Sequence, residues 1–176
     1  MFLDSMVAFN AVSLPRVLAD AATHPTWAGV QQALDATALS RPGVRSGWET
    51  RLRMCFRFDA RLPDPLVNVA IFDLSEQFLG IADLFEPEAG LVAEFDGGQH
   101  REAEQHRRDN IREEKFEAAN LVVVRGDKTD VRSDRRRLVS RLQDGYRRGR
   151  QRNRGLDTWT LTQPYWWKQK ASVGIS

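Results

Sequence analysis

The chain has 176 residues, enough for one domain with a hydrophobic core and small appendages. Its 41% hydrophobic and 28% charged residues are typical of a globular protein and argue against overall disorder. The net charge of +2 conceals a strong asymmetry, because residues 132–154 contain ten arginines and only two acidic residues. Such segregation predicts a polyanionic partner for that part of the chain.

The apolar runs, the N-terminal residues and the cysteine count indicate the compartment in which the protein works. No apolar run approaches the roughly 18–20 residues that span a bilayer. The N-terminal stretch lacks the basic start of a signal peptide. The single cysteine, Cys55, excludes an internal disulfide and a multi-cysteine zinc site, and its helical phase predicts an inert core residue. We therefore expect a cytoplasmic protein with no membrane contact.

Residues 1–45 are expected to form a helical N-terminal segment. Pro15 is typical of a first helical turn, and a second helix is predicted over 27–39, ended by the Arg-Pro-Gly at 41–43. The main domain is expected over 46–150. It begins with a helix capped by Ser46, with Glu49 three residues later. The apolar face of this helix comprises Trp48, Leu52, Cys55 and Phe56.

Strands and helices then follow in a simple order. Strands are predicted at 66–73, 77–86, 90–96 and 121–126, with helices at 101–119 and 133–148. Asn120 is a plausible left-handed residue after the first of these helices. The uniformly apolar last strand is typical of burial on both faces and must enter by a crossover. The expected fold is α/β: a mixed four-stranded sheet flanked by helices, with residues 151–176 as a basic, aromatic tail.

Three acidic residues interrupt the second and third strands. If the turn that ends at Gly90 has an even length, Phe85 faces Val92 and Asp83 faces Glu94. Asp96 lies two residues beyond Glu94 and therefore shares its face. An odd turn would put Asp83 on the opposite face, so this inference depends on register.

Carboxylates that close repel one another unless a cation neutralises them. A hard divalent ion such as Mg²⁺, with Mn²⁺ as a substitute, suits oxygen ligands, and the predicted ligands are Asp83, Glu94 and Asp96. His100 is near enough to orient or deprotonate a water, and such an ion can stabilise charge on a phosphodiester.

Structural roles compete with these chemical ones. Asp96 in Asp-Gly-Gly could bond only its own turn, and Glu49 could be only a capping residue. Asp83 could form a structural salt bridge with Arg53 or Arg112. A histidine after a turn, such as His100, is more often a surface residue.

The ordered set of motifs resembles the Vsr-like branch of the PD-(D/E)xK nuclease superfamily, which includes very short patch repair endonucleases. The similarity covers roughly residues 46–148, and the matching pieces are 46–53, 61–71, 80–100, 107–116 and 120–131. The resemblance implies a restriction-endonuclease-like fold. It also implies a DNA endonuclease dependent on Mg²⁺.

The resemblance assigns roles residue by residue. Glu49 would be the acid carried by the first helix, Asp83 the metal-binding aspartate and Glu94 the acid of the next strand. Asp96 and His100 would complete the Glu-x-Asp-Gly…His pattern of this branch. Asp109 and Arg112 match its Asp-x-x-Arg helix, in a supporting role.

One departure from the wider superfamily concerns the general base. Asp96 occupies the position of the usual lysine, which the Vsr-like branch typically lacks. The identity of the general base is therefore left open, and His100 is the best candidate. Similar domains also occur in longer actinobacterial proteins that look like antitoxin-type transcriptional regulators, and residues 1–45 resemble the region before the nuclease-like domain there.

The basic end of the chain is predicted to bind the DNA backbone, because arginine pairs well with phosphate. The candidate contacts are Arg132, Arg135, Arg136, Arg137, Arg141, Arg147 and Arg148. The tryptophans of the tail could stack on unpaired bases, but packing on the domain is the favoured role.

The leading hypothesis is a Mg²⁺-dependent endodeoxyribonuclease with an activated water. The alternative is a catalytically inactive DNA-binding regulator or antitoxin-type module on the same fold. A third hypothesis is a protein-interaction domain of a toxin–antitoxin pair. DNA is the expected partner in the first two, a homodimer or another protein partner is compatible with the sequence, and no small-molecule cofactor is expected.

Overall fold

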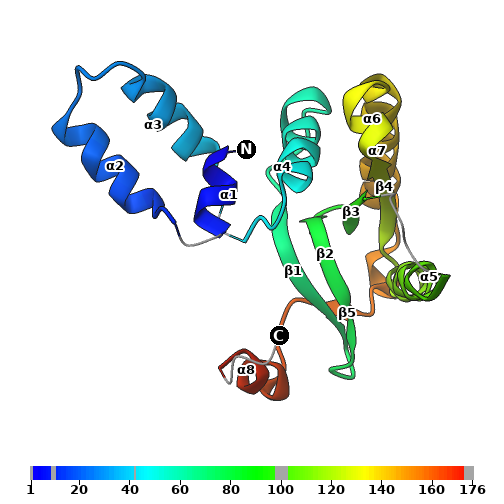
Figure 1. Ribbon diagram of the computed structural model, residues 1–176. Coiled ribbons are helices and arrows are strands. Elements are labelled where there is room, and N and C mark those ends of the chain that lie inside the picture. The colour runs from blue at the N-terminus through cyan, green and yellow to red at the C-terminus, as the bar shows by residue number, and fades with distance from the viewer. Residues whose placement is uncertain (1, 9–10, 42, 98–102, 173–176) are drawn as a thin grey trace.

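The computed structural model describes residues 2–8, 11–41, 43–97 and 103–172. Figure 1 shows the chain order of its elements. The N-terminal segment contains α1 (Phe2–Ala8), α2 (Leu14–Thr23) and α3 (Val30–Leu39). The central elements are α4 (Gly47–Met54), a π-helical turn (Cys55–Asp59), β1 (Leu66–Asp73), β2 (Phe78–Glu86), β3 (Leu91–Asp96), α5 (Ala103–Ala118) and β4 (Val122–Asp127). The last elements are α6 (Lys128–Arg132), α7 (Arg135–Gln151), a 3₁₀ turn (Arg154–Leu156), β5 (Trp159–Thr160) and α8 (Tyr165–Ser172).

The protein is an α/β structure with a mixed sheet of five described strands in the order β4-β3-β2-β1-β5. β1, β2 and β3 form an antiparallel meander, and β4 runs parallel to β3 after the crossover through α5. The predicted crossover is confirmed. The prediction of four strands is wrong, because the two residues of β5 pair with the end of β1. A two-residue strand has no alternation of side chains from which it could be recognised.

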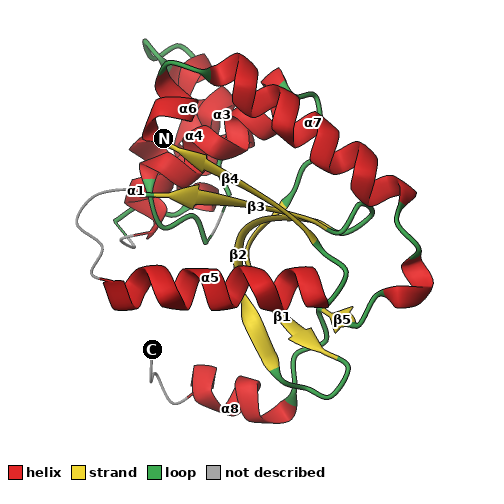
Figure 2. Cartoon of the chain, turned by 90° about the vertical axis from the view of Figure 1, so that its right-hand side faces the viewer, coloured by secondary structure: helices red, strands yellow, loops and turns green. Residues whose placement is uncertain are grey.

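Each face of the sheet has its own hydrophobic core. On one face, Leu52 of α4 and Leu138 and Leu142 of α7 pack over Leu84 and Leu91. On the other face, Phe116 of α5 packs in a second cluster with Ile71, Phe85, Val92 and Leu121. Figure 2 shows the sheet between α5 on one side and α4, α6 and α7 on the other. The predicted apolar faces of α4 and α7 are therefore confirmed.

Several local predictions are also confirmed. Ser46 caps α4, because its Oγ accepts the Glu49 N–H at 3.2 Å. Asn120 is left-handed, with φ of 67°, directly after the last turn of α5. The β2–β3 turn closes with a Gly90 N–H to Pro87 carbonyl bond of 3.2 Å. Phe85 faces Val92, as an even turn requires.

The N-terminal segment is attached to α4 by a buried polar cluster. Asp4 of α1 accepts a 2.9 Å hydrogen bond from the Thr50 hydroxyl and lies 3.9 Å from the Arg53 guanidinium. Arg53 is fully buried and donates to the Leu39 carbonyl at 2.5 Å. In Figure 1, α1, α2 and α3 lie together beside α4. No helix of the described residues is both long and apolar enough to cross a membrane.

Candidate active site

Asp83 and Glu94 lie where β2 and β3 separate. The last paired residues of the two strands are Leu84 and Ala93, and the same register continued by one residue places Asp83 opposite Glu94. The Phe95 N–H donates to Asp83 Oδ2 at 2.9 Å. A side-chain oxygen thus accepts an amide hydrogen at the end of the ladder. This bond holds the Asp83 carboxylate beside the strand that carries Glu94.

The electrostatics of Asp83 are unfavourable for a negative charge. Burial raises the pKa of this carboxyl above its ordinary value, and the nearby Glu49 carboxylate raises it further. The Phe95 amide and the Arg112 and Arg45 guanidinium groups oppose that rise in pKa. The net pKa shift is upward, so a bound cation would stabilise the ionised form of Asp83.

Glu94 is more deeply buried, with 4% of its side chain exposed. Its Oε2 accepts a 3.1 Å hydrogen bond from Arg112, and the Arg125 Nε lies 3.8 Å away. Its Oε1 is buried with no hydrogen-bond partner among the described residues. Burial raises the pKa of Glu94, Arg112 lowers it, and Asp83 raises it again, with a net upward shift. One buried oxygen of this carboxylate is therefore available to a ligand.

Glu49 approaches this pair from α4. Its Oε2 accepts the Arg45 N–H at 2.9 Å and the Asn68 amide at 2.8 Å. A complete capping box would use the Ser46 N–H instead, so the carboxylate holds the loop before the helix. Asn68 also donates to the Gly43 carbonyl at 2.6 Å, and its φ of 48° is left-handed within β1. Glu49 thus has a structural role and lies close enough to Asp83 to affect its pKa.

The remaining predicted acids and the histidine are less completely described. Asp96 ends β3 and, by strand alternation, shares the face of Glu94. His100 lies outside the described residues, and Asp109 lies in α5 with its side chain outside them. Among the described residues, no group of three or more histidine, cysteine, aspartate or glutamate side chains is arranged to hold a metal ion.

The sequence suggested a structural salt bridge of Asp83 with Arg53 or Arg112, but both arginines have other partners. Arg53 is directed to Asp4 and Leu39 at the N-terminal segment. Arg112 forms its salt bridge with Glu94 and contributes to Asp83 only through its charge. Neither arginine forms a salt bridge with Asp83.

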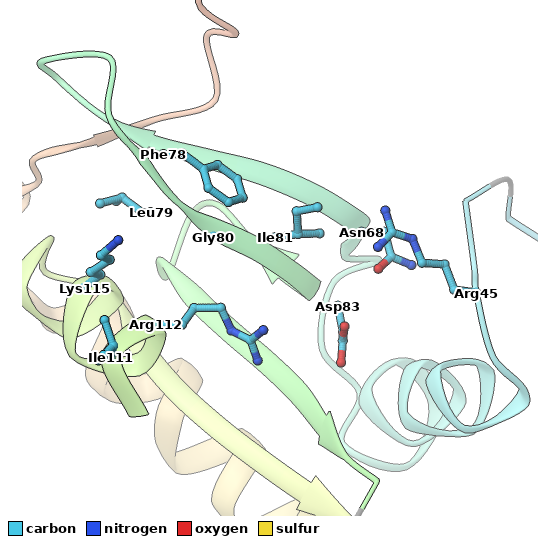
Figure 3. A pocket seen from close by; sticks show the side chains of 10 residues that line it. All are labelled: Arg45, Asn68, Phe78, Leu79, Gly80, Ile81, Asp83, Ile111, Arg112 and Lys115. Carbon is cyan, nitrogen blue, oxygen red and sulfur yellow. The ribbon is translucent and has the colours of Figure 1, made fainter. Parts of the chain in front are cut away.

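A pocket of about 490 Å³ opens beside Asp83 (Figure 3). It is bounded by the loop before α4, by β1 and β2, and by α5. Its lining residues are Arg45, Asn68, Phe78, Leu79, Gly80, Ile81, Asp83, Ile111, Arg112 and Lys115. In Figure 3, Arg112 extends from α5 toward Asp83, and Arg45 lies beside Asn68. The pocket thus combines cationic groups with an apolar wall.

Gly80 sets the path of the Arg112 side chain across β2. A Cβ at this position would lie 2.8 Å from Arg112 Cγ and 2.8 Å from Phe116 Cζ. Because Phe116 is fully buried, its ring cannot easily move away. The absence of a side chain at Gly80 therefore permits the close passage of Arg112 toward Glu94.

The predicted DNA-binding arginines lie on α6 and α7. Six of them are exposed, and Arg141 of α7 is half-buried next to a smaller pocket of about 370 Å³ at β4. Several have acidic partners: Arg135 with Asp59, Arg141 with Asp130, and Arg147 with Asp144. Arg136, Arg137 and Arg148 are exposed and form no salt bridge with any described residue.

Trp48 brings a further group of cations to the carboxylate site. Its ring stacks on Phe95 with a centroid separation of 5.2 Å. Three cationic groups lie over that ring at 4.7, 6.0 and 4.9 Å: Arg51, Lys128 and Arg132. Arg132 is therefore next to the strand end that carries Glu94, whereas the other predicted arginines lie along α7.

The tryptophans of the tail pack against the domain, which confirms the favoured prediction. Trp159 contacts Phe85 edge to face at 5.1 Å. Trp167 stacks on Phe78 at 4.8 Å and contacts Phe72 at 5.3 Å, and Trp166 also contacts Phe72.

Several site residues were missed by sequence reasoning. Asn68 and Arg125 each interrupt an apolar strand, and that interruption was a usable signal. Arg45 and Lys115 carried no comparable signal, because single basic residues in a loop or on a charged helix are common. Their positions depend on how β2, α4 and α5 meet.

Comparisons of this chain with protein-family models, with curated proteins and with solved structures found no match.

Proposed function

We propose that this protein is a Mg²⁺-dependent endonuclease acting on DNA. The observation that carries the proposal is the pair of buried carboxylates, Asp83 and Glu94, opposite each other where two strands part. Both have raised pKa values, and both lie beside arginines. Buried like charges at the edge of a cationic pocket are typical of a functional site rather than of a core.

The donor set fits Mg²⁺. This ion typically uses one or two protein carboxylates, with water and substrate phosphate completing its coordination. Glu94 Oε1 has no hydrogen bond among the described residues, and Asp83 repels Glu94. When bound, Mg²⁺ would supply charge stabilisation to the phosphodiester and lower the pKa of a water. Asp83 and Glu94 would hold it, with Asp96 as a further candidate ligand.

The protein's own residues would then orient the reacting groups. The Phe95 amide fixes one oxygen of Asp83, and Arg112 and Arg125 fix one oxygen of Glu94. Glu49 holds the Arg45 loop against Asn68 at the pocket entrance. Arg112 and Arg45, close enough to act on the charge of Asp83, would attract the substrate phosphate. His100 is the proposed general base that takes the proton from water.

The order of elements supports a restriction-endonuclease-like fold of the Vsr-like branch. An acid-bearing helix (α4) precedes an antiparallel meander, and α5 returns the chain to a parallel strand. The proposed metal ligands occupy β2 and β3, and Glu49 reaches them from α4. This arrangement agrees with the residue roles that the resemblance implies.

One observation favours a second function on the same fold. Arg112 and Arg125 already lie within salt-bridge distance of Glu94, so this carboxylate has protein cations beside it without a metal. A protein of this kind could bind DNA as a regulator or antitoxin-type module and cleave nothing. The exposed arginines of α7 that have no described salt bridge would serve either function.

Cleavage assays separate the two functions. Plasmid and single-stranded DNA are incubated with the protein in Mg²⁺, Mn²⁺ or EDTA, beside Asp83→Asn and Glu94→Gln. Glu88→Gln, on the exposed β2–β3 turn, is the matched carboxylate control. We expect metal-dependent cleavage that falls by about 100-fold or more in the two site variants and persists in the control. Cleavage that survives both site substitutions would exclude this site, and binding without cleavage in either metal would favour the regulator.

DNA binding is tested separately through its salt dependence. Replacing Arg136 and Arg137 by alanine should weaken binding in EDTA and reduce the slope of log affinity against log salt by about 1–2 units. Arg16→Ala, on the exposed face of α2, is the control. An unchanged slope would remove the N-terminal turn of α7 from the DNA contact.

A further inference from the structure

Two cations that line the pocket beside Asp83 form no salt bridge with any residue that the structure describes. Arg45 and Lys115 are both exposed, and neither side chain has a hydrogen-bond or salt-bridge partner among the described residues. They line the pocket from different elements, the loop before α4 and helix α5. The Arg45 guanidinium is close enough to Asp83 to lower its pKa. Figure 3 places Arg45 beside Asn68 and Lys115 at the other end of the pocket, so an anionic group bound at Arg45 would lie next to the proposed metal ligands.

The same pocket has an apolar wall that no other part of the described chain covers fully. Phe78, Leu79 and Ile81 of β2 are only partly buried, and Ile111 of α5 is 39% exposed. Figure 3 shows Phe78 and Ile81 on the β2 side of the pocket and Ile111 with Lys115 on the α5 side. The wall offers aliphatic and aromatic contacts of the kind on which a nucleobase packs.

Size and composition together restrict the ligand. The pocket volume of about 490 Å³ is within the usual range for a small-molecule site. It holds one nucleotide comfortably but not a base pair with its two backbones. An inorganic anion would leave the apolar wall unused, and an uncharged apolar ligand would leave the cations unused.

We propose that this pocket binds a single unpaired nucleotide, with its phosphate at Arg45 and its base against Ile81 and Ile111. This inference rests on the proposed function and extends it, because it names the substrate class. The nucleic acid that reaches Asp83 and Glu94 is single-stranded or locally unpaired. The exposed arginines of α7 then hold the adjoining backbone, and the pocket selects against an intact duplex at the site.

The experiment measures binding alone, with the full chain in EDTA. Amide chemical-shift changes and titration calorimetry are recorded with deoxyadenosine 5′-monophosphate, deoxyribose 5-phosphate and decanoate. An unpaired oligonucleotide and a fully paired hairpin of equal length are compared in the same way. We expect the mononucleotide to shift amides of residues 78–81 and 111–115. We also expect the unpaired oligonucleotide to bind at least about fivefold more tightly than the hairpin.

Two exposed substitutions separate the two halves of the pocket. Arg45→Ala should weaken binding of both the mononucleotide and the sugar phosphate by about fivefold. Ile111→Ser should weaken only the mononucleotide, by about threefold. Arg16→Ala on α2 is the matched charge control and should change neither affinity.

Several results would overturn the proposal. Two of them concern the pocket: amide shifts confined to α7, or a mononucleotide affinity unchanged by Arg45→Ala. Two concern the ligand: decanoate bound more tightly than the mononucleotide, or a hairpin bound as tightly as the unpaired strand. Failure of the nuclease proposal gives a different pattern. Binding in EDTA would then be intact and pocket-dependent, while no metal supports cleavage.

Discussion

Glu94→Gln should stabilise the protein at neutral pH, although it replaces a residue that makes a salt bridge. Burial disfavours the ionised carboxylate and raises its pKa, whereas the glutamine amide carries no charge, and relieving such a buried charge is worth roughly 1–3 kcal/mol. The attraction that is lost is smaller, because Arg112 and Arg125 are 37% and 26% exposed and such pairs contribute about 1 kcal/mol or less. We expect a net gain of about 1–2 kcal/mol in the free energy of unfolding, or roughly 2–8 °C in Tm.

The pH dependence follows from the direction of the pKa shift. A carboxyl group with a raised native pKa binds more protons in the native state than in the unfolded state between the two pKa values. The free energy of unfolding of the wild type therefore falls as pH rises through that window, whereas the glutamine variant has no such titration. The advantage of Glu94→Gln should be complete above the native pKa and should vanish as pH approaches about 4.3, the unfolded-state value.

Urea denaturation followed by tryptophan fluorescence, between about pH 4 and pH 8, measures this difference. Glu86→Gln is the matched control, because Glu86 is 3% exposed but its carboxylate accepts the Glu88 and Ala89 N–H groups at 3.2 and 2.8 Å. That variant should lose about 1–3 kcal/mol at neutral pH. The reasoning is refuted if Glu94→Gln is destabilised like Glu86→Gln, or if its advantage does not shrink in acid.

Three further predictions concern other parts of the molecule. Mg²⁺ at about ten times its dissociation constant should raise the free energy of unfolding by roughly 1.4 kcal/mol in the wild type and not in Asp83→Asn; thermal denaturation with Mg²⁺ or EDTA measures this. Burial raises the pKa of the Cys55 thiol to about 11, so at neutral pH a thiol reagent should modify it only through unfolding, at a rate that rises with urea. Asp4→Ala leaves the fully buried Arg53 without its carboxylate and should cost about 3–5 kcal/mol by urea denaturation, whereas Asp35→Asn, exposed on α3, should change little.

The sequence by itself determined the features that depend on neighbouring residues. Alternating and helical periodicities specified the meander, the crossover and the apolar stripe of Leu138 and Leu142. An even turn at Gly90 was enough to predict Phe85 opposite Val92, and hence Asp83 opposite Glu94. These predictions succeed because side-chain direction in a helix or strand follows from sequence spacing alone.

The tertiary structure alone decided which groups meet across elements. Arg53 could have faced Asp83, but it lies against Asp4 because α1 docks on α4, and Arg112 reaches Glu94 across Gly80. The pocket that joins Arg45 to Lys115 exists only where a loop and α5 flank β2. Such pairings depend on the spatial approach of segments far apart in the chain, and no local period of the sequence encodes that approach.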